Sequence, residues 1–156
     1  MAIRRYKVTP TVTDGAYSAN DVVGGLLTFD GLRNGTLQSI TICDNAAQAV
    51  DYFLVLFEAA PTGISNNATF DIADADLDKI IYQDNMIGTG SSGVNRQAFT
   101  DNSYQYIYGL SVPLWSAGGT VYGFLITTDT PTYAATSDIT VTLQVKDFDT
   151  VKAFGV

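Results

Sequence analysis

The sequence contains no histidine and a single cysteine, Cys43. Without histidine, Ser-His-Asp and Cys-His nucleophilic pairs, imidazole general bases and His-containing zinc sites are excluded. One cysteine can form neither an intrachain disulfide nor a cysteine-rich metal site. We therefore expect no enzyme, no metal centre and no cofactor.

Basic residues are scarce as well. Eight Lys and Arg stand against sixteen Asp and Glu, which gives a formal charge of −8. Arg4, Arg5 and Lys7 are three of the eight, so residues 8–156 carry five bases and all sixteen acids, a formal charge of −11. Because phosphate binding needs clustered Lys and Arg, this balance argues against nucleic acid and anionic membranes as partners. The chain is an acidic body with a basic N-terminal tip.

Long apolar runs are also missing. No run approaches the roughly 20 residues that span a bilayer, and the first residues lack the apolar centre of a secretory signal, so we expect synthesis in a reducing cytoplasm. What is present is a chain of 156 residues of which 46% are hydrophobic, enough for one core. We expect a single domain over residues 8–156, with residues 1–7 as a basic arm or an edge strand.

Alternating apolar and polar residues predict short β-strands. Residues 138–146 alternate throughout, which is the period of a half-buried strand. Residues 36–43 alternate too, but Leu37 falls out of phase, which predicts a bulge near Ser39. With further strands predicted at residues 4–11, 22–29, 52–57, 80–87, 105–112 and 121–126, about eight strands separated by turn residues indicate an all-β antiparallel sandwich or barrel.

Two of these strands differ from the rest. Residues 52–57 and 121–126 are apolar at consecutive positions, so each must be covered on both faces. The cover can come from a central position in a sandwich or from a subunit contact. Both alternatives remain open at the level of sequence.

The connecting segments carry further predictions. One short helix is expected near residues 71–79, with acids at its start, Lys79 at its end, and Ile72, Leu77 and Ile80 facing a sheet. Asn34-Gly35 is expected to close a hairpin. Residues 88–103 are rich in glycine and small polar residues, which predicts a long exposed loop without strands.

Three motifs have a structural explanation that we prefer. Gly88–Gly93 matches G-x-G-x-x-G, but no helix pattern follows, which favours a flexible loop over a phosphate site. Asp74, Asp76 and Asp78 have the spacing that opens a calcium loop, but the expected glycine and glutamate are replaced by Lys79 and Asn85. Helix-start carboxylates explain them better, although an irregular oxygen-ligand site stays open. A carboxylate-based hydrolase is a further hypothesis, for which no specific pair of aspartates can be nominated.

Tyrosines form one candidate contact surface. Tyr104, Tyr106 and Tyr108 share one face of a predicted strand, and Trp115 follows soon after. Tyrosine offers a large rigid contact area with a polar tip, which suits a protein interface or a carbohydrate-stacking platform. The alternative is an ordinary aromatic core face.

The basic tip forms the other candidate contact. Arg4, Arg5, Tyr6 and Lys7 could lie along an acidic neighbour and add backbone hydrogen bonds to it. The alternative is a strand of the chain's own sheet with solvated charges, because charged residues commonly protect sheet edges.

Several blocks of the sequence resemble a family of small virion-associated proteins of tailed bacteriophages. The similarity runs from about residue 8 to residue 146 and rests on a pattern of blocks rather than on a catalytic signature. The blocks are residues 8–12, 16–17, 23–28, 37–41, 53–57 with Pro61-Thr62, 70–77, and 122–127 with residues 130–133.

This resemblance implies a jelly-roll-like β-sandwich displayed on the phage head as a decoration or cement protein. Such proteins are typically symmetric oligomers, often trimers, that bridge subunits of the major capsid protein, and they are made in the host cytoplasm. No catalytic residues belong to that role. The alternative is a head-fibre or tail-associated protein that binds a receptor or glycan through Trp115, the Tyr104–Tyr108 face or residues 88–103. A neck, tail-tube or head-completion role also stays open.

Overall fold

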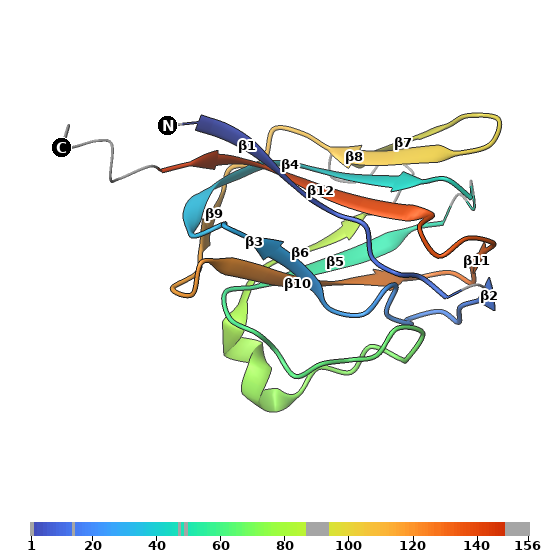
Figure 1. Cartoon of the computed structure of the whole chain (residues 1–156), viewed down its shortest axis with the longest axis horizontal. Coiled ribbons are helices and arrows are strands. Elements are labelled where there is room, and N and C mark those ends of the chain that lie inside the picture. Colours follow the sequence, from blue (N-terminus) through green and yellow to red (C-terminus); the bar gives the residue numbers. More distant parts are fainter. Residues whose placement is uncertain (1, 14, 47, 49, 87–93, 149–156) are drawn as a thin grey trace.

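The computed structural model describes residues 2–13, 15–46, 48, 50–86 and 94–148. Two antiparallel sheets pack face to face in it (Figure 1). The larger sheet has the order β1 (Ala2–Val8), β12 (Ile139–Asp147), β4 (Asn34–Asp44), β8 (Ser103–Ile107) and β7 (Val94–Ala98), with β9 (Val112–Trp115) also paired to β4. The smaller sheet has the order β3 (Leu27–Asp30), β10 (Thr120–Thr127), β5 (Tyr52–Phe57) and β6 (Ile80–Met86), and the short β2 (Gly15–Ala16) pairs with β11 (Thr132–Tyr133).

The strand order is that of a jelly roll. Eight strands remain when β2, β7, β9 and β11 are set aside. Numbered one to eight along the chain, strands 1, 8, 3 and 6 (β1, β12, β4 and β8) form the larger sheet in that order. Strands 2, 7, 4 and 5 (β3, β10, β5 and β6) form the smaller sheet in that order. This exchange of successive strands between two sheets is the double Greek key of jelly rolls. The expected all-β, jelly-roll-like sandwich is confirmed.

The main core lies between the two sheets because each strand turns its apolar residues to the same side. From the larger sheet come the inward residues of β4 and β12, and from the smaller sheet those of β3, β5 and β10. All are buried, with exposed fractions close to zero. The alternation read from residues 138–146 therefore decides which face of β12 points inward: Ile139, Val141, Leu143 and Val145.

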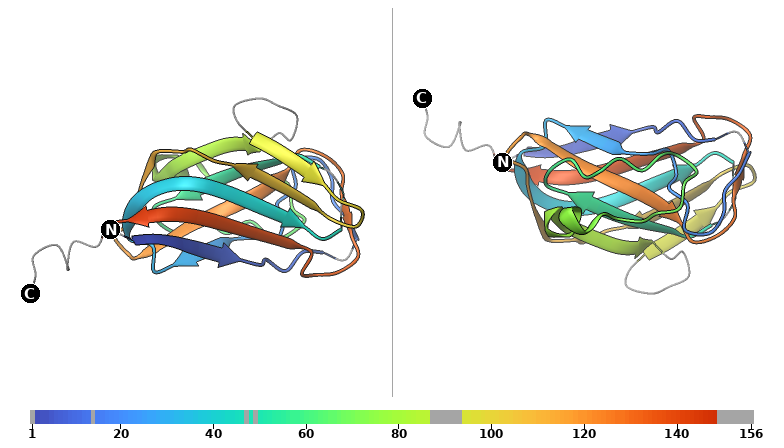
Figure 2. Two further views of the ribbon diagram at one scale, coloured as in Figure 1. Left: turned by 90° about the horizontal axis from the view of Figure 1, so that it is seen from above. Right: turned by 90° about the horizontal axis from the view of Figure 1, so that it is seen from below.

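A second apolar cluster covers the outer face of the smaller sheet. Val55 and Phe57 of β5 pack there with Phe124 and Ile126 of β10. Residues 58–79 cross over them, which the right view of Figure 2 shows as the segment that contains η1 (Asp74–Lys79). The segment contributes Ile64, Phe70 and Ile72 to the cluster. The two consecutively apolar strands are thus covered on both faces within one chain, and they need no subunit contact.

The bulge predicted near Ser39 is confirmed. Ser39 pairs with Gln144 and Leu37 with Val145, so Gln38 is the extra residue between them. The shift returns Leu37 to the buried side, together with Ile40 and Ile42. One inserted residue thus explains the phase break in the sequence.

The hairpin predicted at Asn34-Gly35 is wrong. Both residues lie inside β4, and β3 and β4 belong to different sheets. A Cβ on Gly35 would lie 2.6 Å from Val145 Cγ1 and 2.8 Å from the Lys146 carbonyl oxygen. The glycine therefore permits close approach of β4 and β12 rather than a turn.

Two further predictions need correction. Residues 88–103 are not free of strands, because β7 occupies Val94–Ala98 as an edge strand paired with β8. Residues 88–93 lie outside the described residues. The strand predicted at 105–112 is two strands, because Gly109 adopts a positive φ of 72° between β8 and β9. The edge strand was missed because its composition is polar.

The helix near residues 71–79 is present as η1, a 3-10 helix that starts at Asp74. Ile72 and Ile80 face the sheet as predicted, but Leu77 is 53% exposed. Asp76 is buried in its place and accepts hydrogen bonds from the Thr62 backbone N–H at 2.7 Å and from Lys79 Nζ at 2.6 Å. The bond from Lys79, together with that from Thr62, lowers the pKa of Asp76 to about 2.

Candidate functional site

The outer face of the larger sheet is the candidate site. We call it the open face, because no described segment crosses it, in contrast to the smaller sheet (Figure 2). It is formed by the outward side chains of β1, β12, β4, β8 and β9, which alternate with the buried core residues. The strands therefore present polar and aromatic side chains in rows to solvent.

Residues 2–8 form the edge strand β1, in which all seven residues pair with β12. Alternation along β1 divides the four residues of the basic tip into two pairs. Tyr6 faces the sandwich and packs against the core, and Arg4 lies on the same side of the strand. Arg5 and Lys7 point to the open face, where both are exposed.

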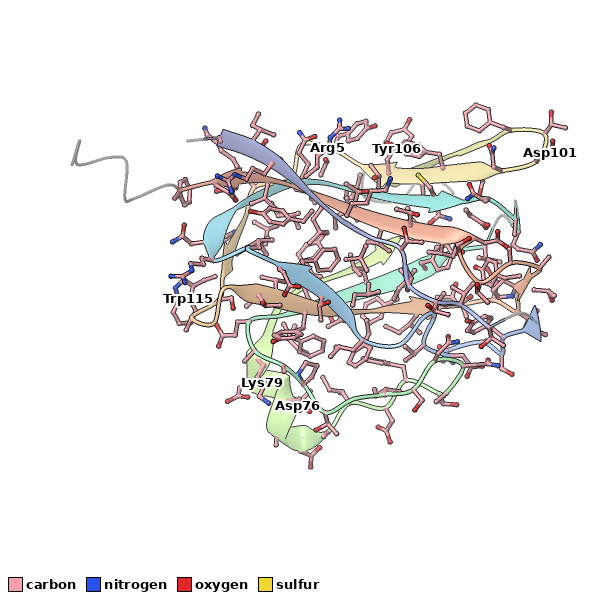
Figure 3. All side chains as sticks on the ribbon, viewed as in Figure 1. Arg5, Asp76, Lys79, Asp101, Tyr106 and Trp115 are labelled. Atoms are coloured by element: carbon pink, nitrogen blue, oxygen red, sulfur yellow. The ribbon has the colours of Figure 1, made fainter. Side chains whose placement is uncertain are left out.

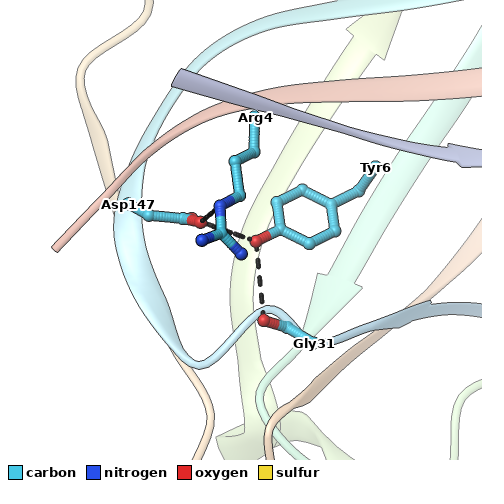
Figure 4. A network of polar contacts seen from close by, with 4 residues as sticks. All are labelled: Arg4, Tyr6, Gly31 and Asp147. Carbon is cyan, nitrogen blue, oxygen red and sulfur yellow. Dashed lines mark hydrogen bonds and ion pairs between the residues drawn. The ribbon is translucent and has the colours of Figure 1, made fainter. Parts of the chain in front are cut away.

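Arg4 and Tyr6 belong to an internal polar network at the sheet edge (Figure 4). Arg4 Nε lies 3.0 Å from Asp147 Oδ2, and the Tyr6 hydroxyl donates to the same carboxylate at 2.9 Å. Burial and the hydrogen bond to Asp147 raise the pKa of Tyr6 to about 12. These contacts help to fix β1 against β12. Tyr6 is half-buried, whereas the Arg4 side chain remains 56% exposed while it contacts Asp147.

The three tyrosines lie on the open face rather than in the core. Ser103, Gln105 and Ile107 are the buried residues of β8. The Tyr104 and Tyr106 ring centroids are 5.4 Å apart, and those of Tyr106 and Tyr108 are 4.6 Å apart in a stacked arrangement. The aromatic core alternative is therefore wrong for these three residues.

The tyrosine hydroxyls are linked to each other. Tyr104 and Tyr108 approach to 3.3 Å between their hydroxyl oxygens. Burial and this contact raise the pKa of Tyr104 to about 12. The Tyr104 hydroxyl therefore remains a protonated hydrogen-bond donor throughout the physiological pH range.

Arg5 and Lys7 share one groove with Tyr104 and Tyr108. The groove has a volume of about 470 Å³, with the β1 cations on one side and the β8 tyrosines on the other. Figure 3 shows Arg5 and Tyr106 on the same outer side of the larger sheet. The floor between the walls comes from β12 and β4 and consists of Ser39, Thr41, Cys43, Asn45, Thr140, Thr142 and Gln144.

The open face carries no acid, although the chain is acidic. The six strands of the larger sheet contain only two carboxylates, Asp44 and Asp147. Asp44 is 2% exposed and accepts hydrogen bonds from the backbone N–H groups of Ala46 and Gln48. Asp147 belongs to the internal network with Arg4. Within the described part of the chain, neither Arg5 nor Lys7 forms an ion pair, so the groove is a local region of positive charge.

Trp115 lies apart from the tyrosines. It pairs with Asn34 at the start of β4, whereas Tyr104 pairs with Cys43 near the end of that strand. Its side chain is 55% exposed beside the buried Leu114. The structure thus brings together two of the predicted contact regions, Arg5 with Lys7 and Tyr104 with Tyr108, and leaves Trp115 at the far end of the same sheet (Figure 3).

Sequence reasoning missed the floor of the groove. Thr140, Thr142 and Gln144 belong to the alternating residues 138–146, for which the sequence predicts only a half-buried strand, and Cys43 stands out only as a lone cysteine. Burial raises the pKa of the Cys43 thiol. The available signal was that polar positions of neighbouring strands in one sheet must share a face, but the order of the strands could not be read from the sequence.

The remaining candidates give no cluster of ligands. Among the described residues, no three His, Cys, Asp or Glu side chains gather as a group that could hold a metal ion. The Asp76 carboxylate of the calcium-like segment is bound by Lys79 of the same chain. In that same part of the chain, no helix is long and apolar enough to cross a bilayer. The sequence matches no protein-family model and no curated protein.

Proposed function

We propose that this chain is a non-enzymatic virion protein that binds the outside of a tailed-bacteriophage capsid and stabilises it by bridging subunits of the major capsid protein. The phage assignment rests on the resemblance of the sequence blocks. The docking surface is the open face, and the observation that carries it is the groove between Arg5 with Lys7 and Tyr104 with Tyr108.

The chemistry of the groove supports binding rather than catalysis. Its lining consists of hydroxyls, amides, one thiol and two cations, and it contains no carboxylate. The acid and base pair of a carboxylate-based hydrolase therefore has no candidate in this groove. Tyrosine and arginine, in contrast, are residue types that dominate protein interfaces, because they combine a large contact area with polar groups.

The oligomeric part of the proposal is a symmetric homo-oligomer, with a trimer favoured by the resemblance. Its candidate contact is the end of the larger sheet where Ile3, Trp115 and Phe148 are exposed by 64%, 55% and 44%. Ile3, Lys146, Thr36 and Pro113 lie side by side across four neighbouring strands. Phe148 is two residues from Lys146 and Trp115 is two residues from Pro113, so the three exposed apolar side chains lie at the same end of the sheet. Exposed apolar side chains that gather in this way mark contact surfaces.

Rebinding to capsids tests the docking surface. Purified protein is added to phage heads stripped of this chain, and occupancy is measured for the wild type and for the double variant Arg5→Glu with Lys7→Glu. We expect wild-type binding and a loss of at least about tenfold in affinity for the variant, since reversing a contacting charge commonly exceeds 1.4 kcal/mol. Point substitutions are preferable to deleting residues 1–7, because the deletion would expose β12.

Arg33→Glu is the matched control, because Arg33 is exposed and does not line the groove. It makes the same charge change per residue and should leave occupancy unchanged. A wild-type protein without affinity for stripped heads would contradict the capsid proposal, and equal occupancy of the double variant would contradict the docking surface. Native mass spectrometry of the free protein tests the oligomer, and a strict monomer on and off the capsid would exclude the trimer.

A further inference from the structure

We propose that the groove of the open face binds an extended polypeptide segment whose carboxylates occupy alternate positions, with the segment lying along β1. This inference rests on the proposed docking function and names the chemistry of the partner segment. Its basis is the spacing of Arg5 and Lys7 together with the hydroxyl and amide lining opposite them.

The two cations on the β1 side of the groove are spaced like same-side residues of an extended chain. Arg5 and Lys7 are two residues apart on one face of β1, so their Cα atoms are separated by about 6.8 Å along the strand. An extended ligand segment repeats its same-side residues at the same interval. Two acidic residues separated by one other residue would therefore meet Arg5 and Lys7 in register, whereas adjacent acids would point to opposite sides.

The width of the groove suits one extended segment. Two strands, β12 and β4, separate the walls on β1 and β8, which stand about 14 Å apart at the usual spacing between neighbouring strands. A single extended chain with its side chains fits between them. The floor offers Thr41, Thr140, Thr142 and Gln144, whose hydroxyl and amide groups can both donate and accept hydrogen bonds to a ligand backbone.

The tyrosine wall favours a peptide over a sugar. Carbohydrate binding by stacking needs a free ring face, but Tyr106 stacks against Tyr108 at 4.6 Å and lies 5.4 Å from Tyr104. These rings therefore cover one another in part. Tyr104 and Tyr108 also line the groove, and their hydroxyls supply donors for carbonyl or carboxylate oxygens across from the cations.

Binding of two isomeric peptides to the full-length protein tests the register. One peptide alternates Asp and Thr, and the other has the same composition with its Asp residues adjacent. We expect the alternating peptide to bind about tenfold more tightly by calorimetry, the equivalent of one well-placed charge contact. Arg5→Gln and Lys7→Gln should each remove most of that preference, and Arg33→Gln should leave it intact.

Cys43 supplies an independent readout of occupancy. It is the only cysteine and it lines the groove, so thiol alkylation reports on this site alone. We expect the alternating peptide to slow alkylation of Cys43 severalfold at mildly alkaline pH, and the adjacent isomer to slow it less. The same comparison with an oligosaccharide of uronic acids shows whether a sugar protects the thiol instead.

Each outcome decides between the two proposals. Equal binding of the two peptides, or stronger protection by the oligosaccharide, overturns the alternating-carboxylate inference. If neither peptide binds while capsid occupancy still depends on Arg5 and Lys7, the inference fails and the docking surface stands. If the alternating peptide binds but capsid occupancy does not depend on Arg5 and Lys7, the groove chemistry stands and the proposed docking surface fails.

Discussion

The two sheets of the sandwich have outer faces of opposite chemistry. The smaller sheet is covered by residues 58–79, which contain five acids and one base and supply apolar side chains to a second core. The larger sheet is open, acid-free on its outer side, and lined by Arg5, Lys7, tyrosines and threonines. Figure 3 shows Asp76 and Lys79 on one side of the molecule and Arg5 and Tyr106 on the other.

This difference follows from the hydrophobic pattern of each sheet. The central strands of the smaller sheet are apolar at consecutive positions, and the chain itself provides the second layer that they need. The strands of the larger sheet alternate, so their outer side chains are stable in water without a cover. An open face of this kind is available for a partner, whereas the covered face is already occupied.

The largest expected effect is on stability and separates the two faces directly. Phe124 is fully buried beneath the cover, with its ring centroid 5.8 Å from that of Phe57 and 5.9 Å from that of Phe70. Phe124→Ala should lower the free energy of unfolding by about 3–5 kcal/mol, because it removes buried area and leaves a cavity. Tyr106→Ala on the open face should cost about 1 kcal/mol or less.

Chemical denaturation of both variants at low protein concentration measures this contrast. Phe124→Leu serves as the control and should recover most of the loss, since it restores most of the buried volume. Similar losses for Phe124→Ala and Tyr106→Ala would mean that the open face is buried in the isolated protein, and the comparison of the faces would then be wrong.

A smaller effect concerns how residues 58–79, which cover the smaller sheet, are held in place at low pH. The pKa of Asp76 in the folded protein is about 2, below its ordinary 3.8. A lowered folded-state pKa stabilises the protein above about pH 4, and this contribution is lost as the pH falls towards 2. Asp76→Asn should therefore lower the melting temperature at neutral pH and flatten its decline between pH 4 and 2.

Calorimetry over a pH series tests this expectation. Asp78→Asn is the matched control, because Asp78 is an exposed residue of the same short helix. Between pH 4 and 2, its melting temperature should fall as steeply as that of the wild type. An Asp76→Asn curve that also runs parallel to the wild type would show that the Asp76 carboxylate does not fasten the cover.

The smallest effect is spectroscopic and belongs to the open face. The pKa of Tyr104 is raised to about 12, so the folded protein holds this proton more tightly than the unfolded chain does. Its contribution to stability is present below pH 10 and is lost as the pH rises through 12. Tyr104→Phe should lower the amplitude of the absorbance transition near pH 12 by one phenolate and leave that of Tyr6, whose pKa is also about 12.

Tyr108→Phe sharpens the same measurement. Burial is the first cause of the raised pKa and the contact with Tyr108 the second, so this variant should move the Tyr104 transition only part of the way back towards 10. An unchanged high-pH transition in Tyr104→Phe would show that another tyrosine is responsible.

Several elements could be predicted from the sequence because their signals are local. Residues 52–57 coincide with β5, and the bulge at Gln38 and Ser39 was visible as a break in alternation. The edge strand β7 could not be predicted, because an edge strand needs backbone pairing more than an apolar face. Leu77 was misplaced because only Asp74–Lys79 are helical, so Ile72 and Ile80 lie outside the helix and do not fix the face that Leu77 takes.

Part of the candidate site could likewise be predicted from local sequence patterns. The tyrosine face and the basic tip were visible as patterns of adjacent residues, and so was the need for cover over residues 52–57 and 121–126. The sequence by itself determined the fold class, the acidic balance and which residues of each strand turn inward, since these depend on composition and on the two-residue period of a strand.

Only the tertiary structure decided which strands are neighbours. The jelly-roll order places β12 and β4 between β1 and β8, so residues from distant parts of the sequence line one groove. It also gave the smaller sheet a cover from its own chain and left the larger sheet open. The strand order and the position of the cover both depend on pairing between distant parts of the chain. That pairing is determined by the burial of all apolar faces together, and no local sequence pattern encodes it.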